Sequence, residues 1–169
     1  MTREEFVEVL KERGYSYEIE GDKVVVTDGR FVHLGALTSL PPGVEFRNRG
    51  YVNLGALTSL PRGVEFRNGG YVSLTSLTSL PPGVKFNNRD YVWLDSLTSI
   101  PPGVEFRNGG SVFLNYLTSL PPGVEFKNGK DVSLDSLIDG WFDEWNGNIK
   151  GIGSKRLLNF MISKGVFER

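Results

Sequence analysis

The sequence predicts an all-β protein, a solenoid of 20-residue coils with two short strands in each coil and a helical cap at either end. Three observations support this fold class. From Phe31 to Asn128 the same residue types return every 20 positions without an insertion, apolar and polar residues alternate over two short stretches of each coil, and the flanking sequences carry helical patterns instead. The recurring positions are apolar and spaced for burial, which excludes low-complexity disorder.

The first 23 residues predict an N-terminal cap that begins with a helix. Thr2 and Glu5 have the spacing of a capping box, and Gly14 supplies a stop signal. Apolar residues between these signals fall on one helical face. We therefore expect a helix over Arg3–Arg13.

A β-hairpin is predicted after this helix. Tyr15–Glu20 and Lys23–Thr27 have strand-like composition and are separated by a Gly21-Asp22 turn. Val24 and Val26 fall in register with the repeat, so the second strand of the hairpin also forms half a coil ahead of the first complete one. The solenoid is therefore predicted to span residues 24–139.

Each complete coil reads as two strands joined by turns. Val52-Asn53-Leu54 and Val64-Glu65-Phe66 alternate apolar and polar residues, which is typical of strands buried on one face. Pro61-Arg62-Gly63 predicts the turn between them, because proline fixes φ and glycine tolerates a positive φ, and Asn68-Gly69-Gly70 predicts the other corner. The side chains expected inside this coil are Val52, Leu54, Leu57, Leu60, Val64 and Phe66.

Residues 140–169 leave the repeat and predict the C-terminal cap. A single coil buries too little apolar surface to fold alone, so both ends of the stack need covering. Trp141, Phe142 and Trp145 follow the last repeat leucine and are expected to cover the last coil. A helix is predicted over Ser154–Lys164, with Gly165 as its stop.

The recurring Leu-Thr-Ser-Leu-Pro segment, for example Leu57–Pro61, resembles the short leucine-rich repeats of secreted bacterial effectors and the LRR-like tandem repeats of phage and bacterial proteins. The resemblance covers about two thirds of the chain. It implies protein recognition along the strand face, without an effector's catalytic domain. The recurring asparagine, from Asn48 to Asn128, lies at a different corner from that of the family, which favours a compact two-stranded coil. We expect its side chain to satisfy the turn backbone.

Composition and charge exclude several classes of function. The 169 residues include 19 Lys and Arg and 20 Asp and Glu, a net charge of −1, so the chain lacks the basic surplus of a general nucleic-acid binder. Cysteine is absent, which fits a reducing compartment. No segment is apolar enough for a membrane span, and acidic residues stand where a signal peptide has a basic end. We expect a cytoplasmic protein without a membrane partner.

Positions at which the repeat copies differ are free of the packing requirements of the coil. The outward position of the first strand reads His33, Asn53, Ser73, Trp93, Phe113 and Ser133. Two residues earlier the series reads Phe31, Tyr51, Tyr71, Tyr91, Ser111 and Asp131. Both series are expected on one exposed face, and large exposed apolar patches mark interaction sites. The predicted protein-binding patch therefore contains Tyr71, Tyr91, Trp93 and Phe113, with Tyr116 at its margin. A ring stack that only stiffens the sheet, or a patch covered by the C-terminal segment, would give the same pattern.

The second strand is expected to expose two charged rows. The first contains Glu45, Glu65, Lys85, Glu105 and Glu125, and the second contains Arg47, Arg67, Arg107 and Lys127. Opposite charges in adjacent rows predict a solvated ion-pair face. The alternative is that the basic row, with Arg49 and Arg89, follows a phosphate backbone. The parallel acidic row opposes this, which makes nucleic-acid binding the weaker hypothesis.

No catalytic, cofactor or metal site is predicted. The chain has one histidine, His33, and its serines and carboxylates recur as repeat positions or lie on cap surfaces. Asp139, Asp143 and Glu144 cluster in the C-terminal cap, but their spacing matches no cation-binding loop. Gly151-Ile152-Gly153 is too weak a signal for a phosphate loop.

These features together predict a protein-protein interaction module and not an enzyme. A phage or bacterial accessory protein that binds or inhibits a host or defence protein through the aromatic face would fit them. Two alternatives stay open. One is a structural protein that forms a homodimer through the same face or an exposed solenoid edge, and the other is a nucleic-acid binder that uses the Arg/Lys row.

Overall fold

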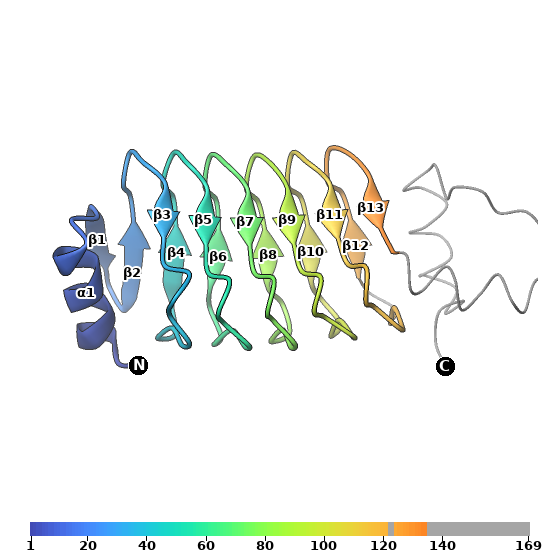
Figure 1. The fold of residues 1–169 in the computed structure, drawn as a ribbon, viewed down its shortest axis with the longest axis horizontal. Helices are drawn as coiled ribbons and strands as arrows, with labels where there is room; N and C mark the ends of the chain where they lie inside the picture. The colour runs from blue at the N-terminus through green and yellow to red at the C-terminus, as the bar shows by residue number, and fades with distance from the viewer. Residues whose placement is uncertain (122–123, 135–169) are drawn as a thin grey trace, which may run out of the picture.

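The computed structural model describes residues 1–121 and 124–134. Over these residues the chain forms a β-solenoid with one helix at its N-terminal end (Figure 1). The helix is α1 (Arg3–Glu12). The strands are β1 (Tyr17–Glu20), β2 (Lys23–Val26), β3 (Val32–His33), β4 (Val44–Phe46), β5 (Val52–Asn53), β6 (Glu65–Phe66), β7 (Val72–Ser73), β8 (Lys85–Phe86), β9 (Val92–Trp93), β10 (Glu105–Phe106), β11 (Val112–Phe113), β12 (Glu125–Phe126) and β13 (Val132–Ser133).

The strands belong to two sheets that run along the solenoid. The charged sheet has seven strands in the order β1-β2-β4-β6-β8-β10-β12, and the aromatic sheet has six in the order β13-β11-β9-β7-β5-β3. Except for the antiparallel pair β1–β2, neighbouring strands are parallel and join equivalent residues of successive coils, such as Val52 with Val72 and Glu65 with Lys85. The predicted two-stranded coil and its 20-residue register are confirmed.

The interior is filled by one apolar side chain from each recurring position. All six predicted inward residues of the coil are buried: Val52, Leu54, Leu57, Leu60, Val64 and Phe66. The phenylalanines stack along the axis, with ring centroids 5.4 Å apart for Phe46 and Phe66 and 5.0 Å apart for Phe106 and Phe126. Such ring pairs add about 0.5–1.5 kcal/mol each beyond the apolar area they bury. Stability therefore arises between coils, as the repeat requires.

The two corners of the coil are closed by different means. At the Pro-x-Gly corner Gly43, Gly63, Gly83 and Gly103 have φ between 73° and 80°, which other residues adopt only with strain. At the asparagine corner the amide nitrogen of Asn68 donates to the carbonyl oxygens of Gly50 at 3.1 Å and Gly70 at 2.9 Å. The asparagine thus ties its own turn to that of the preceding coil, as predicted.

The N-terminal cap closes the first coil with side chains as well as strands. The predicted capping box of α1 is present, and Phe6 and Leu10 are buried against the solenoid core. The helix ends at Glu12, one residue earlier than expected, and β1 starts at Tyr17, two residues later than expected. Tyr15 lies outside the hairpin, and its hydroxyl oxygen accepts a hydrogen bond from the His33 amide at 2.9 Å.

The limits of the repeat agree with its register within the described residues. β2 pairs in parallel with β4, Val24 beside Val44 and Val26 beside Phe46, so half a coil does precede the first complete one. At the other end Val132 pairs with Val112. The predicted C-terminal cap, with its aromatic residues and helix, lies outside the described residues. Among the residues that are described, no helix has the length and apolar character needed to cross a bilayer.

Candidate protein-binding face

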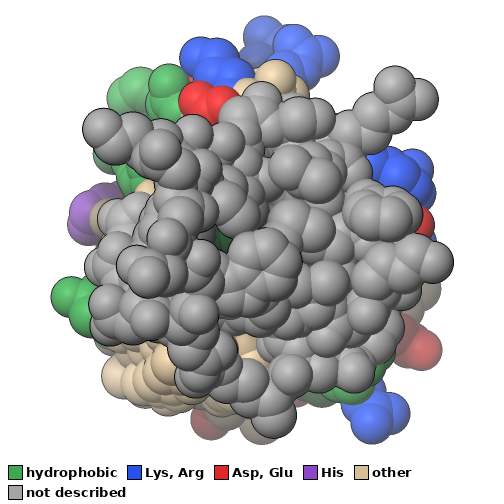
Figure 2. Space-filling view, turned by 90° about the vertical axis from the view of Figure 1, so that its right-hand side faces the viewer, with side chains coloured by type: hydrophobic (Ala, Val, Ile, Leu, Met, Phe, Trp, Pro, Cys, Tyr) green, Lys and Arg blue, Asp and Glu red, His purple; other side chains and the backbone are tan. Residues whose placement is uncertain are grey.

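The aromatic sheet presents its variable side chains on one side of the solenoid. Val72, Val92 and Val112 point inward and are buried, so the residues beside them in the strands point outward. Parallel pairing in register places Ser73 beside Trp93 and Trp93 beside Phe113. In Figure 2, which looks along the solenoid from the C-terminal side, hydrophobic side chains project at the left, and many charged ones at the top and right.

Four of the five predicted site residues form one contiguous cluster. The Trp93 ring lies 4.8 Å from that of Tyr71 in an edge-to-face arrangement, 6.1 Å from that of Tyr91 and 5.9 Å from that of Phe113. The Tyr91 and Phe113 rings are 6.0 Å apart. The residue beside Trp93 in the preceding coil, Ser73, is small and leaves room for the indole to reach Tyr71.

Two further aromatic residues extend the cluster toward the N-terminus. The Tyr51 ring stacks on that of Tyr71 with centroids 4.6 Å apart, and the Phe31 ring stacks on that of Tyr51 at 4.4 Å. We call the set the aromatic row: Phe31, Tyr51, Tyr71, Tyr91, Trp93 and Phe113. The sequence contained the signal for Phe31 and Tyr51, since both belong to the series that includes Tyr71 and Tyr91.

Tyr116 does not join the row. Its side chain is 64% exposed, and no ring contact connects it to another aromatic residue within the described part of the chain. Its place at the margin of the patch stays a prediction.

The Phe31, Tyr51 and Tyr71 rings stack face to face, whereas the Trp93 ring meets that of Tyr71 edge to face. Tyr51, Tyr71, Tyr91, Trp93 and Phe113 are half-buried, whereas Phe31 at the end of the row is 60% exposed. Burial raises the pKa of the Tyr71 hydroxyl, and the neighbouring Tyr51 raises it further. Rings that already pack on one another have little free face for a nucleobase, but a continuous apolar row suits a protein surface.

Polar groups flank the C-terminal half of the row. The Lys130 ammonium lies 5.4 Å from the Tyr91 ring centroid, close enough for a cation-π contact. The Asn115 amide donates to an oxygen of Asp95 at 2.9 Å. An apolar centre with a polar rim is the common anatomy of protein interfaces.

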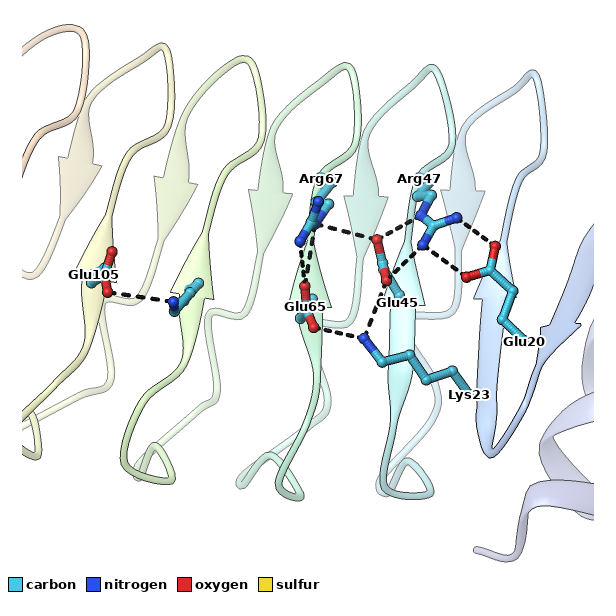
Figure 3. Close-up of polar contacts among 8 residues, drawn as sticks. Glu20, Lys23, Glu45, Arg47, Glu65, Arg67 and Glu105 are labelled. Atoms are coloured by element: carbon cyan, nitrogen blue, oxygen red, sulfur yellow. Dashed lines mark hydrogen bonds and ion pairs between the residues drawn. The ribbon is translucent and has the colours of Figure 1, made fainter.

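The charged sheet carries ion pairs on its outer side (Figure 3). Arg47 binds the Glu20 carboxylate through two nitrogens at 2.6 and 3.0 Å and also donates to Glu45. The Lys23 ammonium lies 2.8 Å from Glu65, which raises the pKa of Lys23 and lowers that of Glu65. The predicted ion-pair face is present in this part of the chain.

One prediction for this sheet is wrong. Glu45 was expected to be exposed, but its side chain is only 1% exposed. Three cations cover it: the Arg47 Nε at 2.6 Å, the Arg67 Nε at 3.3 Å and the Lys23 Nζ at 3.5 Å. A carboxylate with this many partners is satisfied without water. The arginines of the row are therefore engaged with carboxylates, which weakens the case for phosphate binding.

The other features considered in the sequence form no metal site within the described residues. These residues contain no group of three or more His, Asp or Glu that could hold a metal ion. Asp139, Asp143, Glu144 and Gly151–Gly153 lie outside the described residues. The His33 backbone takes part in covering the edge of β3, with the carbonyl oxygen accepting from Arg13 at 3.0 Å.

No family model, curated protein or solved structure among those compared with the chain matches it. The aromatic row therefore has to be interpreted from its own geometry.

Proposed function

We propose that this protein binds another protein through the aromatic row, as an interaction module without a catalytic role. One observation carries the proposal: rings from successive coils form a continuous series of ring contacts on the outer side of one sheet. Coil packing does not require these rings, since Ser73, Ser111 and Ser133 occupy equivalent positions elsewhere in the repeat. A phage or bacterial accessory protein that binds or inhibits a host or defence protein is the context that we propose.

The energetics favour Trp93 and Phe113 as anchors. Interface energy concentrates in a few aromatic or arginine residues near the centre of a patch, and each costs about 2 kcal/mol or more when truncated. Trp93 contacts three other rings of the row, so its removal would also loosen its neighbours.

The test is a Trp93→Ser, Phe113→Ser double variant. Serine is native at equivalent positions, so the fold should be retained, and circular dichroism would check this. The tagged protein would first recover a partner from its native host, and calorimetry with that purified partner should then show binding at least about 30-fold weaker for the double variant.

The matched control places two serines on the other sheet. Glu125→Ser with Lys127→Ser removes an exposed ion pair from the coil that follows Phe113 and should leave the affinity unchanged. Equal binding by the wild type and the aromatic double variant would refute the proposal. Light scattering that shows a concentration-dependent dimer, abolished by the same double variant, would assign the row to self-association instead.

A further inference from the structure

The N-terminal end of the charged sheet has a free strand edge. β1 is the first strand in the sheet order and pairs only with β2 among the described strands. The Thr27 amide donates to the Ser16 carbonyl oxygen at 3.0 Å. Bonded pairs alternate in an antiparallel ladder, so Glu18 and Glu20 turn their backbone groups toward β2, whereas Tyr17 and Ile19 turn theirs away from it.

A cavity that is partly apolar and wide open to solvent lies beside this edge. It has a volume of about 440 Å³ and separates one flank of α1 from β1. Its lining residues are Arg3, Glu4, Val7, Glu8, Lys11, Tyr17 and Ile19. Ile19 is 45% exposed, which is unusual for a strand residue next to a hydrophobic core. The same residues thus combine free backbone groups with apolar side chains that face a cavity.

The opposite face of β1 is acidic. Glu20 points to the charged side of the sheet, where it binds Arg47, and Glu18 shares that side because it is two residues away. Glu18 is exposed and has no hydrogen bond or ion pair with the described residues. In contrast to Glu20, it is available to a strand placed alongside.

We propose that β1 accepts an extended basic segment of another protein as an additional strand of the charged sheet. The segment would pair with the free backbone groups of Tyr17 and Ile19. Its apolar side chains would face the cavity, and a lysine or arginine would lie opposite Glu18 on the outer side.

The acidic face argues against a second copy of this chain as the occupant. Antiparallel pairing of two β1 strands would bring Glu18 and Glu20 of one copy beside the same residues of the other, and like charges at that spacing are destabilising. The acidic side chains therefore disfavour pairing between two copies of this edge. They do not disfavour pairing with a basic strand.

The test uses a blocked peptide of alternating lysine and valine, titrated into the labelled full-length protein and followed by NMR. The amide signals of Tyr17 and Ile19 should shift together, because those groups would become hydrogen-bonded. A peptide of alternating glutamate and valine should bind at least about tenfold more weakly, because it places like charges opposite Glu18.

Two variants separate edge pairing from other effects. Ile19→Pro removes an N–H that points away from β2, so it should block the peptide while the β1–β2 ladder survives. Glu18→Lys changes an exposed side chain and should reverse the preference toward the glutamate peptide. Equal binding of both peptides, shifts confined to the aromatic row, or unchanged binding by both variants would overturn the proposal. This outcome is independent of the test of the aromatic row.

Discussion

Replacing Asn68 by aspartate tests how the solenoid holds its corners together. The Asn68 amide nitrogen lies within hydrogen-bond distance of the carbonyl oxygens of Gly50, Gly70 and Tyr71, at 3.1, 2.9 and 3.2 Å, and the residue is fully buried. Aspartate has almost the same shape but no donor when ionised. Three partly buried carbonyl groups would then lose their donor and face a carboxylate.

The expected loss in the free energy of unfolding follows from the two N–H donors that the substitution removes. Each unsatisfied buried group costs about 1–3 kcal/mol, and the values near the lower end apply because these carbonyl groups are only partly buried. Asn68→Asp should therefore lower the free energy of unfolding at neutral pH by about 2–4 kcal/mol, and by more where repulsion between oxygens adds to it. The surrounding carbonyls would disfavour the charged form and raise the pKa of the new carboxyl in the folded state. The penalty should therefore be complete above that raised pKa and shrink as the pH falls toward the unfolded value.

The same column of the repeat contains a natural comparison. Asp28 occupies the register position of the asparagines, but its carboxylate accepts from the Ser16 amide at 2.9 Å, the Arg30 amide at 2.8 Å and the Arg30 guanidinium at 3.0 Å. Its partners are donors, whereas those of Asn68 are acceptors. Urea unfolding of wild type and Asn68→Asp at pH 7 and pH 4 is the measurement. A midpoint at pH 7 equal to that of the wild type would refute the account of the corner.

Two further predictions concern the N-terminal cap. The Arg30 guanidinium and backbone donors lower the pKa of Asp28 to about 2 from 3.8. The folded value is the lower one, so about 2 kcal/mol of stability should be present above pH 4 and lost as the pH falls toward about 2. Asp28→Asn should flatten this part of the urea-unfolding profile, and an unchanged profile would contradict the assignment. Tyr15→Phe removes the hydrogen bond to the exposed His33 amide and should cost about 0.5–1.5 kcal/mol in thermal unfolding. Tyr17→Phe is its control, and equal losses for the two variants would count against the role of Tyr15.

Much of the fold was predictable because every copy of the repeat shows the same register. A helical start is marked by the local capping box of Thr2 and Glu5, and the two-stranded coil by alternation around Val52 and Val64, so neither needs knowledge of distant contacts. The burial of Glu45 is different. Strand parity places it outward, and only the side chains of Lys23, Arg47 and Arg67, from three different coils or caps, remove it from water.

The aromatic site shows the same division between local pattern and long-range contact. Strand parity was sufficient to bring Trp93 beside Phe113, since both follow an inward valine in register. It says nothing about Tyr116, which follows the strand in a turn where the chain path sets the direction of the side chain. Phe31 and Tyr51 were missed although they share a column with Tyr71 and Tyr91, because only the ring contacts between successive coils show that the row continues toward the N-terminus.

Differences between repeat copies have opposite meanings on the two sheets. On the charged sheet a change is compensated: lysine replaces glutamate at position 85, asparagine replaces arginine at position 87, and Lys85 then lies 3.6 Å from Glu105. Ion pairs between opposite charges are thus retained along the sheet, as expected if this face serves to stabilise the fold. On the aromatic sheet Ser73 gives way to Trp93 and Phe113, and the added rings project outward while the inward positions stay the same. Apolar side chains added to the outer surface in this way stabilise a monomer little and lower its solubility. Their presence is explained if a partner protein covers them.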